Sequence, residues 1–189
     1  MQRFSIYDGL FILLLIGFFC FEIQFFHLAF LFDELWVYGP AVQMMAKNGP
    51  SLLPNVISPD LYRGHPLLFH FLFGWWIKLF GNSIETMRLF ALLISTSLCI
   101  LVYRFASELV NKKMAFFAVL ILLMQPVFLA QASMVLPEVL LAFFSVGMVY
   151  AYWKGGFSWK YLAFSILLIL TKESGIVLVI ILVGYHILV

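Results

Sequence analysis

Ionisable side chains stand beside long apolar stretches of this sequence, in several separate segments: Asp33, Glu34, Arg63, His65, Arg88, Glu138, Lys172 and Glu173. Carboxylates of this kind can accept a proton from a reacting group, and cationic side chains can hold an anion. An ionisable group at membrane depth costs roughly 2.5–3.5 kcal/mol on insertion scales, so such groups usually face a cavity or pair with one another. Acids and bases gathered on one face of a membrane protein would therefore form a polar site.

The presence of each of these residues can also be explained by a structural role, with no part in catalysis or binding. A lone arginine such as Arg88 usually extends its guanidinium to the membrane interface. Glu138 follows a proline and can favour a helix N-terminus through the helix dipole. The acidic pair at 33–34 can mark a helix end, the pair at 172–173 can be a solvated turn, and a histidine such as His65 is more often structural than catalytic.

The residue composition decides what class of protein must position these side chains. Of the 189 residues, 65% are hydrophobic and 11% are charged, whereas a soluble domain has about 45–50% apolar and about 25% charged residues. So much apolar surface cannot be hidden within a water-soluble fold of this length, and lipid is the solvent that accommodates it. The net charge of +2 is too small to indicate a nucleic-acid partner. The two cysteines, Cys20 and Cys99, lie in apolar runs and are typical of small buried hydrophobic residues.

About six apolar stretches follow one another, and each is a candidate for a spanning helix of roughly 17–25 residues. We expect an all-α polytopic membrane protein with spans at 9–31, 86–106, 114–129, 136–153, 159–170 and from 175 onward. The first stretch is too long and too aromatic for a signal peptide, and we expect its Glu22, Gln24 and His27 to be buried polar contacts without chemistry. Because the chain is still apolar at Val189, we expect residues 1–189 to be the N-terminal membrane part of a longer protein.

The long segment between the first two spans is predicted to be ordered. Two parts of it, 35–46 and 67–80, contain tryptophan among many other apolar residues, which favours helices lying in the membrane interface. Glycine and proline residues between them interrupt any helix. The architecture that we expect is therefore a set of spanning helices with a long first outer loop that carries interfacial helices.

The distribution of lysine and arginine predicts the orientation. Basic residues precede the first span and flank the turns at 104–113 and 154–160, which should therefore lie in the cytoplasm. The long loop, the turn at 130–135 and the turn at 171–175 then face outward. All the ionisable residues named at the outset fall on this outer side, and we expect them to form one polar site there.

Four motifs occur in order over nearly the whole chain. They are Asp33-Glu34 with Tyr38 and 41–46; Gly64-His65-Pro66-Leu67-Leu68 with Phe80-Gly81 and Arg88-Leu89; Ser133 with Pro137-Glu138; and Thr171-Lys172-Glu173-Ser174-Gly175. With these motifs the sequence resembles the N-terminal half of GT-C glycosyltransferases that use polyprenyl-phosphate sugars, which include protein O-mannosyltransferases and bacterial aminoarabinose transferases of lipid A. Many relatives have Lys-Pro-Pro-Leu where this chain has Gly64 to Leu67, so the lysine expected to bind phosphate is absent. An aspartate is also common where this chain has Glu138.

The resemblance implies a transferase of the cell membrane that moves a sugar from a polyprenyl-phosphate donor to a hydroxyl of a lipid, glycan or protein acceptor. Transfer would occur at the outer face, with inversion at the anomeric carbon. By resemblance, Asp33 is the general base and Glu34 supports it. Glu138 and Glu173 would bind sugar or acceptor, or a divalent cation if one is used; no metal ligand is otherwise assigned. The side chains implied to bind the donor phosphate are cationic: Arg63, His65, Arg88 and Lys172.

Other classes of function remain compatible with the sequence. A transporter or channel subunit also places charges in membrane cavities, although it would tend to show inverted repeats, and none is visible here. An inactive relative that binds a lipid-linked sugar is the other alternative. The phosphate-cradling glycine loop, the HExxH pair and the CxxC pair of soluble enzymes do not occur in the sequence.

Overall fold

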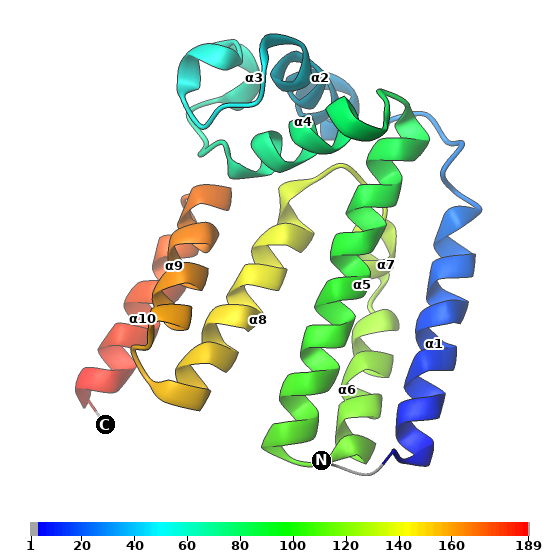
Figure 1. Ribbon diagram of the computed structural model, residues 1–189, viewed down its shortest axis with the longest axis vertical. Coiled ribbons are helices and arrows are strands. Elements are labelled where there is room, and N and C mark those ends of the chain that lie inside the picture. Colours follow the sequence, from blue (N-terminus) through cyan, green and yellow to red (C-terminus); the bar gives the residue numbers. More distant parts are fainter. Residues whose placement is uncertain (1–3, 189) are drawn as a thin grey trace.

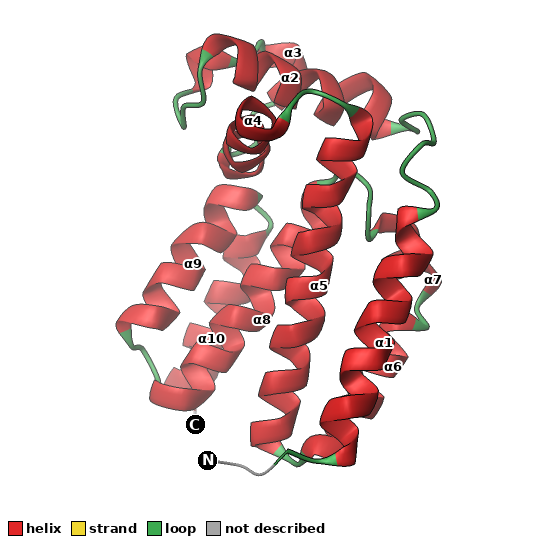
Figure 2. Ribbon diagram, turned by 45° about the vertical axis from the view of Figure 1, so that its right-hand side comes forward, coloured by secondary structure: helices red, strands yellow, loops and turns green. Residues whose placement is uncertain are grey.

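The computed structural model describes residues 4–188, and within them every regular element is a helix (Figure 2). The expected all-α class is confirmed for this part of the chain. A bundle of helices runs along the long axis of the molecule (Figure 1): α1 (Ile6–Ile23), α5 (Ile84–Leu109), α6 (Lys112–Leu123), α8 (Pro137–Gly155), α9 (Trp159–Thr171) and α10 (Gly175–Leu188). Among the described residues, α1 and α5 are long and apolar enough to cross a membrane by length and composition. The arrangement with six spans stays a prediction.

The segment between α1 and α5 folds into a cap over one end of the bundle, at the top of Figure 1. The cap consists of a π-helix η1 (Glu34–Tyr38), α2 (Gly39–Asn48), a short 3-10 helix η2 (Pro54–Val56), α3 (Pro59–Tyr62) and α4 (Leu68–Phe80). Helices α2 and α4 pack closely because Gly74 has no side chain: a Cβ there would lie 2.6 Å from the Cγ of Met45. Helices are thus present in both predicted parts of the loop.

Polar residues and a proline set the starts of four bundle helices. Ser83 Oγ accepts a hydrogen bond from Thr86 N–H at α5, Asn111 Oδ1 accepts from Met114 N–H at α6, and Ser158 Oγ accepts from the third helical N–H at α9. These bonds satisfy backbone donors that the first turn leaves open. Pro137 stands at the first position of α8, where its missing N–H costs nothing.

Two predicted spans differ from the observed helices. The first stretch was expected to be helical to residue 31, but α1 ends at Ile23, where Gln24 Nε2 donates to the carbonyl of Cys20 and satisfies one open acceptor of the helix end. The third stretch was expected to run unbroken over 114–129. It divides into α6, which ends at Leu123, and a short α7 (Pro126–Gln131), because proline has no N–H to continue the helix.

The connections alternate between the two ends of the bundle (Figure 1). The start of α1, the α5–α6 turn and the α8–α9 turn lie at the end away from the cap. The cap, the α7–α8 connection and the α9–α10 turn lie at the other end. The basic turns and the predicted outer segments are therefore at opposite ends, which is the arrangement that the orientation hypothesis requires.

The orientation can be measured with an impermeant thiol reagent on intact cells. After replacement of Cys20 and Cys99, a cysteine at the exposed cap residue Asn55 should be labelled from outside, and one at the exposed Lys113 only after permeabilisation. Both positions are accessible in the fold, so a difference in labelling reports the side of the membrane. Labelling of position 113 in intact cells would contradict the predicted orientation.

Candidate functional site

Glu34 is a completely buried carboxylate at the point where the chain enters the cap. Its Oε1 accepts a hydrogen bond from Val135 N–H at 2.7 Å, and its Oε2 accepts from Leu31 N–H and from Arg88 Nη2, each at 3.3 Å. These donors belong to the α7–α8 connection, the segment after α1 and helix α5. Glu34 therefore ties three separate parts of the chain together beneath the cap.

Arg88 is the cationic partner of Glu34, and its side chain is only 4% exposed. The same Nη2 also donates to the carbonyl of Ala29 at 3.2 Å, while the buried Nε has no hydrogen-bond partner. An interfacial arginine would direct its guanidinium toward water. Arg88 instead holds it inside the protein against a carboxylate, so the interfacial interpretation of this residue is wrong.

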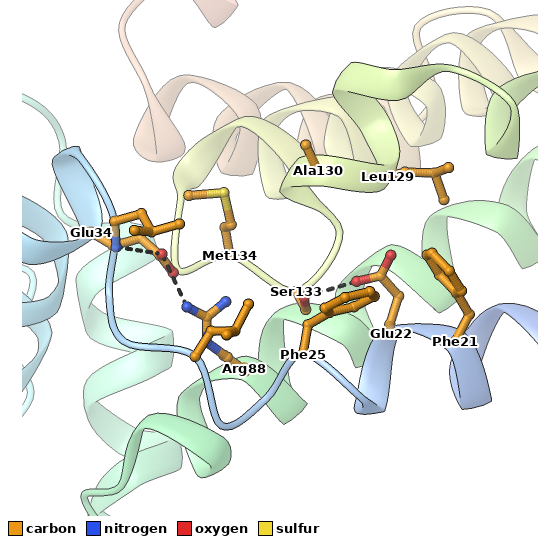
Figure 3. A pocket seen from close by; sticks show the side chains of 11 residues that line it. Phe21, Glu22, Phe25, Glu34, Arg88, Leu129, Ala130, Ser133 and Met134 are labelled. Atoms are coloured by element: carbon orange, nitrogen blue, oxygen red, sulfur yellow. Dashed lines mark hydrogen bonds and ion pairs between the residues drawn. The ribbon is translucent and has the colours of Figure 1, made fainter.

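A cavity of about 310 Å³ lies beside this pair (Figure 3). Glu22, at the end of α1, reaches into it, and the Oε2 of Glu22 accepts a hydrogen bond from Ser133 Oγ at 2.9 Å. Glu22 is thus the buried polar contact expected from the sequence, whereas the same expectation is wrong for Gln24 and His27, which are exposed. The remaining wall is apolar and comes from the end of α1, the segment after it and the region of α7: Phe21, Phe25, Leu28, Leu31, Leu129, Ala130 and Met134.

A second group of charges joins the cap to the bundle, and we call it the cap–bundle cluster: His65, Glu138, Lys172 and Glu173. Lys172 Nζ donates to Glu138 Oε1 at 2.9 Å, and His65 Nδ1 lies 2.9 Å from both carboxylate oxygens of Glu173. The bond that Lys172 donates to Glu138 raises the pKa of Lys172, and the bond with His65 lowers the pKa of Glu173. The α3–α4 linker, the start of α8 and the α9–α10 turn thereby meet.

Tyr38 stands among the charges of the cap and of this cluster. Burial raises the pKa of its phenol, and the carboxylate of Glu138 raises the pKa further. The charges of Lys172, Asp33 and Arg63 also act on it. Sequence reasoning placed Tyr38 in the same motif as Asp33 but gave it no role. That motif was the signal that could have identified it.

Asp33 and Arg63 differ from the other candidates because their side chains are exposed and make no hydrogen bond or ion pair within residues 4–188. Arg63 and the residue directly before Asp33 have unusual backbone conformations. Phe32, directly before Asp33, has φ +49°, and Arg63 itself has φ +51°. Such left-handed conformations cost about 1–3 kcal/mol in residues other than glycine and concentrate at functional sites. Their side chains are free to meet a ligand.

The match to known families decides the class of the chain. A family model described as dolichyl-phosphate-mannose-protein mannosyltransferase matches residues 64–189, more than half of the sequence. The chain belongs to this family. It is therefore of the GT-C type, a multi-pass membrane protein and a glycosyltransferase that uses a polyprenyl-phosphate sugar. Comparisons with curated proteins and with solved structures found no match.

The matched part of this mannosyltransferase-family chain begins at Gly64. It includes Arg88 and the whole cap–bundle cluster, whereas Asp33, Glu34 and Arg63 precede it. The structure brings the two parts together through the Glu34–Arg88 pair and through the charges around Tyr38. The roles of the individual residues remain predictions of the resemblance.

Metal binding was left open by the sequence. Within residues 4–188, no group of three or more His, Cys, Asp or Glu side chains is arranged to hold a metal ion. Glu138 and Glu173 each pair with a cationic or imidazole group instead. A divalent cation in this mannosyltransferase-family chain stays a prediction of the resemblance.

His70, on α4, is a buried histidine next to the site that sequence reasoning did not consider. Its side chain is 2% exposed, and neither ring nitrogen has a hydrogen-bond partner. The ring lies 6.0 Å from that of Tyr38, stacked at 29°. Burial, with a smaller contribution from the charge of His65, lowers the pKa of His70 to about 4. The neutral ring is therefore part of the packing under the cap.

We expect His70→Phe to make the fold less sensitive to acid. A histidine whose pKa is lower in the folded state than in the unfolded state destabilises the fold as pH falls through the window between the two values. From about pH 6.5 to pH 4 this loss reaches about 3 kcal/mol, and about 2 kcal/mol at pH 5. Phenylalanine keeps the ring and removes the titration.

The measurement is thermal unfolding of the purified protein at pH 7 and pH 5. Wild type and the exposed control His27→Phe should lose stability on acidification, and His70→Phe should lose clearly less. An equal loss in all three proteins would show that His70 is not protonated on unfolding in this range.

Proposed function

We propose that this chain transfers a sugar from a polyprenyl phosphate to an acceptor hydroxyl at the outer face of the cell membrane, with inversion. The observation that carries the proposal is that a free carboxylate, Asp33, and cations both free and paired, Arg63 and Lys172, lie near enough to Tyr38 for their charges to act on it. The family match supports the donor class. The outward face follows from the lysine and arginine distribution.

The proposed step is a single displacement. The acceptor oxygen forms a bond to the anomeric carbon while the bond from that carbon to the phosphate oxygen breaks. The hydroxyl proton passes to Asp33, and the electron pair leaves with the polyprenyl phosphate. Because the leaving group is a stable anion, no strong general acid is needed. Attack from the side opposite the phosphate inverts the configuration.

Arg63 and Lys172 are the cations that we assign to the phosphate. Arg63 is exposed and has no acidic partner within the described residues, and Lys172 is 26% exposed and bonded to Glu138. Charge-assisted hydrogen bonds to phosphate are stronger than neutral ones, so an arriving phosphate would compete with Glu138 for Lys172. His65 is a further candidate at the same place. Arg88, held by Glu34, would act by positioning.

Glu138 and Glu173 are assigned to the sugar or the acceptor. Glu138 Oε2 is buried and has no hydrogen-bond partner. A buried acceptor without a donor is uncommon in folded proteins, and a sugar hydroxyl could supply the missing bond. Glu173 is 59% exposed and lies at the edge of the same cluster, where an acceptor would enter.

The test is a transfer assay with the purified, membrane-reconstituted protein and radiolabelled donors. Polyprenyl-phosphate sugars should support transfer, nucleotide sugars should not, and the anomeric configuration of the product should be inverted. Lys172→Gln should raise the KM for the donor roughly ten- to a hundredfold, the loss expected for one charge-assisted bond. The control Lys47→Gln removes an exposed cation of the cap outside the cluster. Donor binding without any transfer would support the inactive relative instead.

A further inference from the structure

A second cavity lies at the end of the bundle away from the cap, between α5, α8 and α9. Its volume is about 520 Å³. One wall is apolar and comprises Leu101, Gly147, Ala151 and Phe164. Gly147 forms part of this wall because a Cβ there would overlap the Phe164 ring, so the two helices approach closely. The cavity has the size range of sites for whole ligands, about 300–1,000 Å³.

The mouth of this cavity carries excess positive charge. Arg104 Nε and Lys154 Nζ share one carboxylate, that of Glu108, at 3.5 and 2.5 Å. Lys160 lies 5.8 Å from the ring centroid of Trp159 and has no acidic partner within residues 4–188. Three cations thus face a single acid, and each of the three borders the cavity. This excess of positive charge favours the binding of an anion at the mouth of the cavity.

Aromatic side chains surround the same mouth. Trp159 is 74% exposed, and the buried hydroxyl of Tyr150 lies beside the shared Glu108 carboxylate and the side chains of Arg104 and Lys154. Tryptophan and tyrosine at the end of an apolar bundle are typical of the level of lipid headgroups.

We propose that this basic cavity binds one anionic phospholipid of the adjacent leaflet. Arg104, Lys154 and Lys160 hold the headgroup phosphate. An acyl chain lies against the Leu101–Phe164 wall. Basic pockets between spanning helices are a known mode of lipid binding. A free phosphate would fill neither the volume nor the apolar wall, so the arrangement favours a lipid. The site lies at the opposite end from Asp33 and is independent of the proposed transfer.

Binding can be measured by native mass spectrometry of the purified protein titrated with phosphatidylglycerol or phosphatidylcholine. We expect one tightly retained phosphatidylglycerol and no matching phosphatidylcholine. Arg104→Gln together with Lys160→Gln should weaken this binding roughly ten- to a hundredfold. The control Lys78→Gln removes a lysine that lies 5.5 Å from the Trp75 ring on the cap, a matched contact at the other end, and should change nothing.

A variant that keeps every charge separates the lipid from a simple anion. Gly155 borders the cavity, and a Cβ there would come no closer than 3.6 Å to Ser158, so this position accepts a side chain, and Gly155→Leu is designed to fill the space. We expect it to lose phosphatidylglycerol as well, and we expect inorganic phosphate not to displace the lipid from wild type. Displacement by phosphate, undiminished binding by Gly155→Leu, or equal binding by the double variant and the Lys78 control would each overturn the proposal.

Discussion

Asp33→Asn should remove nearly all sugar transfer while the protein remains folded and inserted in the membrane. The Asp33 carboxylate is exposed and makes no bond within residues 4–188 that the fold would lose. The amide keeps the size and shape of the side chain but cannot take the proton of the attacking hydroxyl. Removal of a general base typically costs about 10²–10⁴ in rate. We expect turnover to fall by that factor and the donor KM to change little.

The matched control is Asp60→Asn. Asp60 is likewise an exposed carboxylate of the cap, in the first turn of α3, and makes no ion pair within the described residues. Both variants should yield the same amount of membrane-inserted protein with the same melting temperature. If Asp33→Asn turns over lipid-linked sugar at the wild-type rate, the base must be another group, and Glu138 would be the next to test.

The composition was sufficient to predict the class of the protein, and the hydropathy pattern was sufficient to locate most helices. The breaks within the apolar stretches were harder to predict. Pro126 is visible in the sequence, yet an average over an apolar window does not register the loss of one N–H. At the end of α1, the side chain of Gln24 donates a hydrogen bond to the backbone of the helix, and hydropathy carries no information about such a bond.

The candidate site likewise has features that the sequence predicts and features that it does not. Topology predicted that the charged residues share one end of the molecule, and they do. It could not predict the pairing, because Glu34 and Arg88 are far apart in sequence and each had several oppositely charged candidates. The buried His70 and the position of Tyr38 were not predicted for a related reason. Which face of a cap helix turns inward depends on contacts such as Met45 against Gly74, which no periodicity in an apolar helix specifies.

The burial of that pair leads to the second prediction with a large expected effect: Arg88→Met should destabilise the fold by about 3–5 kcal/mol. Methionine fills much of the space but leaves the Glu34 carboxylate buried without a cation. The double variant Arg88→Met with Glu34→Gln removes both charges, so it should be more stable than the single variant. The losses of stability caused by Arg88→Met alone and by Glu34→Gln alone should therefore be strongly non-additive. Thermal unfolding of the four proteins gives the coupling free energy directly.

The control lies on the same helix. Arg104 pairs with Glu108 at 3.5 Å, but its side chain is 67% exposed, and exposed ion pairs contribute about 0–1 kcal/mol. In delipidated protein, Arg104→Met should therefore change the melting temperature little. If Arg88→Met melts like this control and loses only donor affinity, Arg88 is a phosphate ligand whose contact with Glu34 adds little stability. If it melts far lower and the double variant recovers, Arg88 acts by holding Glu34, and the donor phosphate depends on Arg63 and Lys172.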